Sequence, residues 1–149
     1  MLAAKRRLSP LYESSKTETL ADEKPAPAKK KSWGFHLIVD MSACNDKMDS
    51  QMAIRAFFVA IIKKLQMKEL SPLMMKKVSG ENGRGISAVQ MITTSSITFH
   101  GDDDKRCVYL DIFSCKEFKP EIALALIKET FNPQRMTHKF LYRDAGKHG

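Results

Sequence analysis

The stretch Gly85–Cys115, GISAVQMITTSSITFHGDDDKRCVYLDIFSC, decides the fold because it predicts three consecutive β-strands. Ile86–Thr93 is apolar, Ser95–His100 alternates hydroxyl and apolar side chains, and Cys107–Phe113 has the two-residue period of a half-buried strand. Glycine followed by three aspartates at Gly101–Asp104 predicts the hairpin turn between the last two strands.

Four reactive side chains lie in this stretch: Ser87, Ser95, His100 and Cys115. A hydroxyl that can be activated, an imidazole and a thiol on neighbouring strands could meet in one cleft and catalyse a reaction there. Serine and threonine are also common on the solvent faces of strands. These residues alone are therefore compatible with either a catalytic site or an ordinary strand surface.

The composition of the 149 residues fits one domain, with 43% hydrophobic residues for its core and a net charge of +8. Half of that charge lies in residues 1–32, a Pro-, Ala- and Lys-rich segment that predicts a disordered tail. Charge alone would permit this tail to bind nucleic acid, but the sequence contains no recognised nucleic-acid-binding module.

The three cysteines, Cys44, Cys107 and Cys115, are odd in number and lack CxxC spacing. This pattern argues against a disulfide framework and a zinc knuckle, and it indicates a reducing, cytoplasmic environment. No apolar run reaches the length of a membrane span. The basic start at Lys5–Arg7 is not followed by an apolar segment, so we expect no secretory signal, whereas a transit peptide stays open.

The folded domain is expected at residues 33–146, followed by a frayed end at 147–149. Outside the central stretch we expect strands at Gly34–Met41, Leu73–Val78 and Arg135–Arg143, and helices at Ser50–Lys68 and Glu121–Phe131. The order β-α-β-β-β-α-β predicts an α+β two-layer sandwich with a largely antiparallel sheet and both helices on one face. The other face would be half apolar, which favours a homodimer.

Three segments resemble one specific family. GFHLIVDMSACN (Gly34–Asn45), GISAVQMI (Gly85–Ile92) and YLDIFSC (Tyr109–Cys115) are similar to segments of the small, bacterial-type S-adenosylmethionine decarboxylases, which are pyruvoyl enzymes. The resemblance extends from about residue 32 to about residue 146, and the central stretch aligns without a gap. It implies a decarboxylase that supplies the aminopropyl donor for spermidine synthesis.

The resemblance also implies self-cleavage between Thr94 and Ser95. The Ser95 hydroxyl attacks the preceding carbonyl, and elimination from the resulting ester leaves a dehydroalanine that hydrolyses to the pyruvoyl cofactor. By the same resemblance, His100 assists the elimination and Ser87 stabilises the intermediate. Cys115 returns a proton to the substrate carbon after CO₂ has left.

The sequence departs from the family pattern around this serine. The family has Glu at the position of Thr94 and His at the position of Ser96, so Ser96 would be the precursor if the alignment shifted by one. The spacing to the downstream histidine and cysteine favours Ser95. Gly101–Asp104 replaces the family's Thr-Trp-Pro-Glu, so that Asp104 occupies the position of a substrate-binding Glu.

Three alternatives follow from these departures. The acidic turn could favour ornithine or arginine as the substrate of the same chemistry. An uncleaved, non-catalytic homologue could instead bind an active paralogue or a nucleoside. His100 with Asp102–Asp104 could hold a divalent cation, but consecutive aspartates on a turn are more often simply solvated, so we expect no metal.

Overall fold

The computed structural model describes residues 33–80 and 83–144. The expected tail at 1–32 and the frayed end at 147–149 lie outside these residues. The elements follow the expected order: β1 Gly34–Ser42, a 3₁₀ helix η1 Asp46–Asp49, α1 Gln51–Lys64, β2 Met74–Val78, β3 Gly85–Ile92, β4 Ser95–Asp102, β5 Cys107–Ser114, α2 Pro120–Phe131 and β6 Arg135–Arg143.

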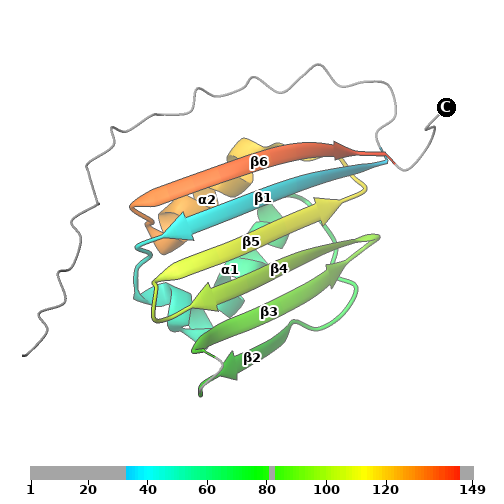
Figure 1. Cartoon of the computed structure of the whole chain (residues 1–149). Helices are drawn as coiled ribbons and strands as arrows, with labels where there is room; N and C mark the ends of the chain where they lie inside the picture. Colours follow the sequence, from blue (N-terminus) through cyan, green and yellow to red (C-terminus); the bar gives the residue numbers. More distant parts are fainter. Residues whose placement is uncertain (1–32, 81–82, 145–149) are drawn as a thin grey trace, which may run out of the picture.

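The six strands form one antiparallel sheet in the order β2-β3-β4-β5-β1-β6 (Figure 1). Strands β2 to β5 follow one another as a meander. The chain then passes through α2 and returns as β6 beside β1, so that β1 is an internal strand. This arrangement puts β4, which begins with Ser95, between β3 and β5.

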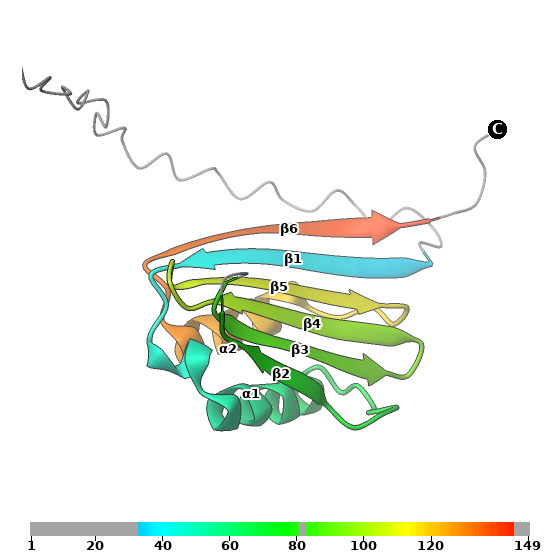
Figure 2. The ribbon, with the colours of Figure 1, turned by 60° about the horizontal axis from the view of Figure 1, so that its bottom comes forward.

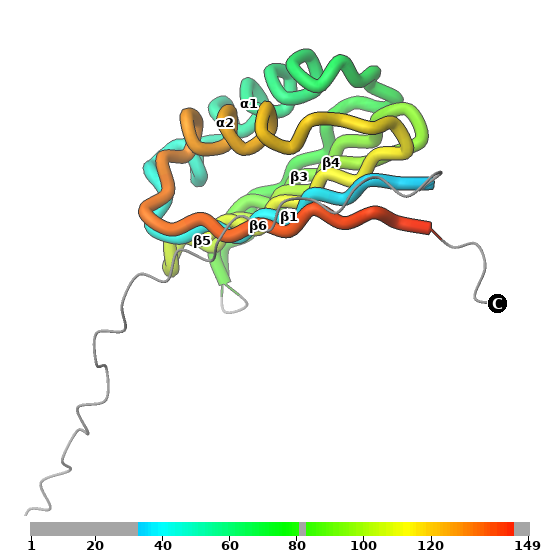
Figure 3. Tube along the Cα trace, turned by 90° about the horizontal axis from the view of Figure 1, so that it is seen from above, coloured from blue at the N-terminus to red at the C-terminus, as the bar shows by residue number. Residues whose placement is uncertain are grey.

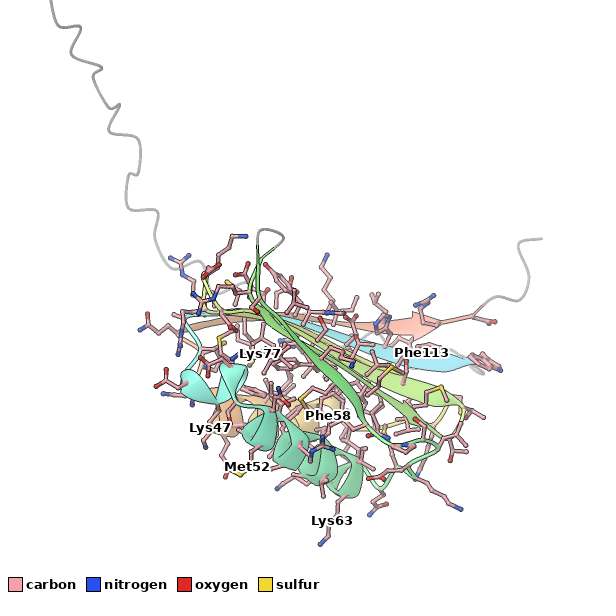
Figure 4. All side chains as sticks on the ribbon, turned by 90° about the horizontal axis from the view of Figure 1, so that it is seen from below. Lys47, Met52, Phe58, Lys63, Lys77 and Phe113 are labelled. Atoms are coloured by element: carbon pink, nitrogen blue, oxygen red, sulfur yellow. The ribbon has the colours of Figure 1, made fainter. Side chains whose placement is uncertain are left out.

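Both α-helices cover the same face of the sheet, which confirms the two-layer α+β fold (Figures 2 and 3). Helix α1 is amphipathic: Phe58 is buried and lies between the helix and the sheet, whereas Met52 is 82% exposed on the outer side with Lys63 (Figure 4). The sheet contributes fully buried side chains such as Ile97 and Phe99 to the same core. Alternate residues of the central strands β1, β3, β4 and β5 therefore hold the two layers together.

The first helix starts where expected but ends earlier. Ser50 caps it, because its hydroxyl accepts a hydrogen bond from the backbone N–H of Ala53 at 3.3 Å. The expected end at Lys68 is wrong, since the helix ends at Lys64 and Gln66 adopts a left-handed backbone with φ of +53°. Residues 65–73, called the connector below, then run to β2 and contact the turn between β3 and β4.

The expected turn at Gly101–Asp104 is also displaced along the chain. Gly101 and Asp102 still belong to β4 and pair with Val108 and Cys107, so the turn occupies residues 103–106. Glycine is required where β3 begins, because a Cβ atom on Gly85 would lie 1.9 Å from the carbonyl oxygen of Gly101. This close approach fixes the start of β3 against the end of β4.

The sheet face away from the helices, called the open face below, carries polar and apolar side chains together. Large apolar side chains on four of its strands are exposed, namely Met74, Met91, Tyr109 and Leu141. This mixture is what the sequence pattern predicted for the second face of the sheet. No helix within residues 33–80 or 83–144 is long and apolar enough to cross a membrane.

Candidate active site

The turn between β3 and β4 brings three of the expected site residues together: Thr94, Ser95 and Cys115. Ile92 and Ser95 pair across the turn, which leaves Thr93 and Thr94 as its two central residues. The Ser95 hydroxyl oxygen accepts a hydrogen bond from the backbone N–H of Cys115 at 3.0 Å, just after the end of β5. The Thr94 hydroxyl contacts the Cys115 thiol. A candidate nucleophile and a candidate proton donor are therefore neighbours.

The connector braces this turn from the side of α1. The backbone N–H of Thr93 donates to the carbonyl oxygen of Lys68 at 2.8 Å, and the Thr93 hydroxyl donates to the same oxygen at 3.3 Å. The backbone N–H of Leu70 donates to the carbonyl oxygen of Met91 at 3.0 Å. No local sequence pattern indicates these contacts, because they join segments more than 20 residues apart.

A cavity adjoins the turn and Cys115, with a volume of about 290 Å³. Its lining comes from the connector, the β3–β4 turn and the end of β5: Gln66, Met67, Lys68, Ile92, Thr93, Thr94, Ser114, Cys115 and Lys116. The lining contains two lysines and no carboxylate. The cavity gives a small molecule access to Cys115 and to Thr94, the residue before Ser95.

Ser87 and His100 form a second cluster on the open face. They are directly opposite each other on β3 and β4, and the Ser87 hydroxyl is 3.0 Å from His100 Nδ1. Tyr109 lies opposite His100 on the other side, on β5. The hydroxyl–imidazole pair suits proton transfer, and the solvent exposure of His100 leaves it accessible to another molecule.

One chain does not bring the two clusters together. Ser95 and His100 are five residues apart on β4, a separation of about 16 Å along an extended strand. Because five is an odd number, the two side chains also start from opposite faces of that strand. The single cleft suggested by the sequence is therefore not formed within the described chain, where the candidate residues lie in two separate clusters.

The acidic turn lies at the end of β4 opposite to Ser95. Asp102 pairs with Lys105 at 3.1 Å, and hydrogen bonds from Lys105, first of all from its backbone N–H, lower the pKa of the Asp102 carboxyl. Asp104 pairs with Arg84 at 3.6 Å, with both side chains exposed. In the part of the chain that the structure describes, no group of three or more His, Cys, Asp or Glu side chains is placed to hold a metal ion.

The remaining cysteines lie away from Ser95. Cys44 is buried at the end of β1, where desolvation raises the pKa of its thiol to about 11 and keeps it protonated. Its carbonyl oxygen accepts hydrogen bonds from the Arg106 guanidinium at 2.6 and 3.1 Å. Cys107 begins β5, where its thiol is 3.4 Å from the Lys105 carbonyl oxygen. Neither thiol is positioned for a role at the β3–β4 turn.

A polar cluster on the open face was not expected from the sequence. His36 Nε2 is 2.8 Å from Asp111, and Arg143 Nη1 is 3.1 Å from His36 Nδ1. Because a guanidinium can only donate, Nδ1 is the acceptor and Nε2 carries the proton that is donated to Asp111. The alternation of strands β1 and β5 places His36 and Asp111 on this face, but their pairing depends on the strand order.

Comparisons with known proteins agree with this architecture. The family model described as S-adenosylmethionine decarboxylase matches residues 35–144. A protein of Clostridium botulinum strain Hall called S-adenosylmethionine decarboxylase proenzyme is 26% identical over 111 residues, which cover 74% of this chain and 93% of the relative. A proenzyme of the same description from Thermomicrobium roseum is 28% identical over 114 residues, covering 71% and 89%.

The fold is shared with a solved structure. The crystal structure of the adenosylmethionine decarboxylase from Aquifex aeolicus superposes with a TM-score of 0.69 at 20% identity, covering 80% of this chain and 98% of that one. Since the family model spans most of the chain, the chain belongs to the S-adenosylmethionine decarboxylase family.

Proposed function

We propose that this chain is a proenzyme that cleaves itself between Thr94 and Ser95 and then decarboxylates S-adenosylmethionine. The observation that carries the proposal is the position of Ser95 at the β3–β4 turn, with its hydroxyl held by the Cys115 backbone at 3.0 Å. Membership of the family and relatives that are named proenzymes support it.

The surroundings of Ser95 fit a pyruvoyl group made from that residue. When formed, this group supplies a carbonyl that accepts the electrons released as CO₂ leaves the substrate. The adjoining cavity of about 290 Å³ offers room beside it. Cys115 lines that cavity, which supports its thiol as the group that returns a proton to the substrate carbon.

Self-cleavage requires the Ser95 hydroxyl to attack the carbonyl carbon of Thr94. The two groups are neighbours in the chain, so the protein has to orient the hydroxyl rather than bring it close. The hydrogen bond from the Cys115 N–H to the hydroxyl oxygen performs this orientation and leaves the hydroxyl proton free to be transferred. Thr94 takes the place of the family's Glu in this arrangement.

We further propose that two copies pair through their open faces. In a two-fold symmetric dimer with antiparallel strands facing each other, the Ser87–His100 end of one sheet lies over the Ser95 end of its partner. The Ser87–His100 pair of one copy would then approach the β3–β4 turn of the other, where the Thr94–Ser95 bond lies. The exposed apolar side chains Met91, Tyr109 and Leu141 support this interface, because burying them between two copies would remove apolar area from water.

The product of the proposed reaction is the aminopropyl donor used in spermidine synthesis. The three cysteines are free thiols, which supports a reducing compartment such as the cytoplasm. The acidic turn is already engaged by Arg84 and Lys105, so an ornithine or arginine side chain would compete with existing ion pairs there. S-adenosylmethionine is therefore the substrate to test first.

Intact mass of the denatured protein tests the cleavage. We expect two fragments, residues 1–94 and 95–149, with no free amine at the start of the second. The Ser95→Ala variant should remain a single chain of 16.9 kDa and release no CO₂ from S-adenosylmethionine. A parent that stays uncleaved, or a Ser95→Ala variant as active as the parent, would contradict the proposal. If CO₂ is released from ornithine or arginine instead, the proposed chemistry stands but its substrate is one of these amino acids.

A further inference from the structure

Thr94 has a backbone conformation that its side chain opposes. Its φ is +56°, in the left-handed region, where a residue with a branched Cβ is an outlier. Glycine or asparagine usually occupies such positions, as Asn132 does where α2 ends, with φ of +41°. The strain lies at the residue that provides the carbonyl of the proposed scissile bond.

The chain before Thr94 is fixed by the connector. The N–H and hydroxyl of Thr93 both donate to the Lys68 carbonyl oxygen, at 2.8 and 3.3 Å. In the connector, two residues after Lys68, the Leu70 N–H donates to the Met91 carbonyl oxygen at 3.0 Å. The upstream half of the turn is thus anchored to a segment outside the hairpin and cannot rotate freely to relax Thr94.

The chain after Thr94 is fixed by β5. The Cys115 N–H donates to the Ser95 hydroxyl oxygen at 3.0 Å, and the Cys115 thiol contacts the Thr94 hydroxyl. That hydroxyl also donates to the Thr93 carbonyl oxygen at 2.7 Å. Strained residues persist only where their surroundings over-determine them, and Thr94 is held on both sides.

We propose that the strain at Thr94 drives the first step of self-cleavage. In this step a bond forms between the Ser95 hydroxyl oxygen and the Thr94 carbonyl carbon, the peptide C–N bond breaks, and the hydroxyl proton moves to the released amine. The product is an ester, which is less stable than the amide, so a relaxed chain would favour the starting peptide. Breaking the peptide bond frees the Thr94 backbone, and the released strain offsets part of this difference.

This inference rests on the proposed cleavage between Thr94 and Ser95, and one series of variants tests it. Thr94→Gly removes the Cβ that opposes the left-handed backbone, Thr94→Ala restores a Cβ, and Thr94→Val restores the branch without the hydroxyl. Each substitution is made in the cleavable chain and in the uncleavable Ser95→Ala chain. Cleavage rates come from intact mass after refolding from denaturant, and stabilities from thermal unfolding of the Ser95→Ala proteins.

We expect opposite orders in the two measurements. Thr94→Gly should cleave slowest, about tenfold slower than Thr94→Val, with Thr94→Ala between them. In the Ser95→Ala background, the glycine variant should melt at the highest temperature and the valine variant at the lowest. Ala43→Gly is the matched control, because it relaxes another left-handed residue, with φ of +52°, outside the site. It should raise the melting temperature without slowing cleavage.

Other outcomes would contradict either the role of strain or the proposed cleavage itself. Equal cleavage rates for glycine and valine, or a glycine variant that is no more stable, would overturn the role of strain. If these equal rates were also slower than the rate of the parent, the hydroxyl and its Cys115 contact would be responsible. Absence of cleavage in every chain, with the stability order intact, would instead refute the proposed function.

Discussion

Strand β4 has two faces with different tasks. Ile97 and Phe99 point under the helices and are fully buried, whereas Thr98 and His100 alternate with them on the open face. Buried apolar residues hold the layers together, and the exposed face between them carries His100, whereas Ser95 begins the strand on the same side as Ile97 and Phe99. In this sheet, substitutions of neighbouring residues can therefore alter the core and the Ser87–His100 pair separately.

The largest expected effect comes from the buried face. Phe99→Ala removes a fully buried ring that packs 5.6 Å from the ring of Phe131, and we expect a loss of about 3–5 kcal/mol in the free energy of unfolding. Denaturant unfolding in the Ser95→Ala chain measures it on one uncleaved species. Thr98→Ala, next along the strand, should cost much less. Similar losses for the two variants would mean that the faces do not differ in this way.

His100→Ala should have the converse effect on the open face. We expect cleavage, or decarboxylation of S-adenosylmethionine, to slow by about 10²–10⁴-fold, the usual contribution of a positioned proton-transfer group. The melting temperature should change little, because His100 is exposed and its side-chain hydrogen bond goes to Ser87. Thr98→Ala again serves as the control, on the same face. A His100→Ala protein with unchanged rates would remove the functional meaning of the Ser87–His100 pair.

The two surfaces of the molecule should also differ in association. Met91→Asp introduces a charge on the open face, and we expect dimer association to weaken about tenfold or more, because the carboxylate would be buried without a partner. Met52→Asp makes the same change on the outer side of α1 and should leave association unchanged. Sedimentation over a range of concentrations distinguishes these outcomes. Equal behaviour of both variants would exclude the open face as the interface.

The smallest effect concerns pH. Burial raises the pKa of the Cys44 thiol to about 11 in the folded chain, against 9.0 for an ordinary cysteine. Between these values the unfolded chain loses this proton and the folded chain keeps it, so stability should fall as pH rises from about 9 to 11. Cys44→Ala should remove this part of the decline, and Cys107→Ala should retain most of it, because burial is the larger cause of the raised pKa and Cys107 the smaller one. Identical pH profiles for the parent and Cys44→Ala would contradict the prediction.

Much of the fold could be predicted because local patterns determine it. The two-residue alternation of Cys107–Phe113 and the helical spacing after Ser50 gave the elements and their exposed faces. The end of α1 could not be predicted from local pattern. The residues directly after Lys64 are not helical, and the Lys68 carbonyl oxygen accepts hydrogen bonds from Thr93, which is 25 residues away in the chain. The position of β6 beside β1 likewise depends on pairing between distant segments.

The site was predicted in part. The sequence singled out Ser87, Ser95, His100 and Cys115 as candidates, whereas the pairing of Ser87 with His100 follows from the two-residue turn at positions 93 and 94, which was not predicted. The odd spacing of Ser95 and His100 was also visible and already placed them on opposite faces. The left-handed backbone of Thr94 was not visible, because threonine disfavours that conformation and its contacts come from elsewhere in the chain.

The position of β4 inside the sheet affects how a cleaved molecule could refold. Cleavage before Ser95 would divide the polypeptide without removing a strand, because β4 stays bonded to β3 and β5 on both sides. The precursor folds as one chain, whereas a cleaved molecule that unfolded would have to bring two separate chains together again. Its refolding would depend on protein concentration, and in dilute solution each molecule would fold only once.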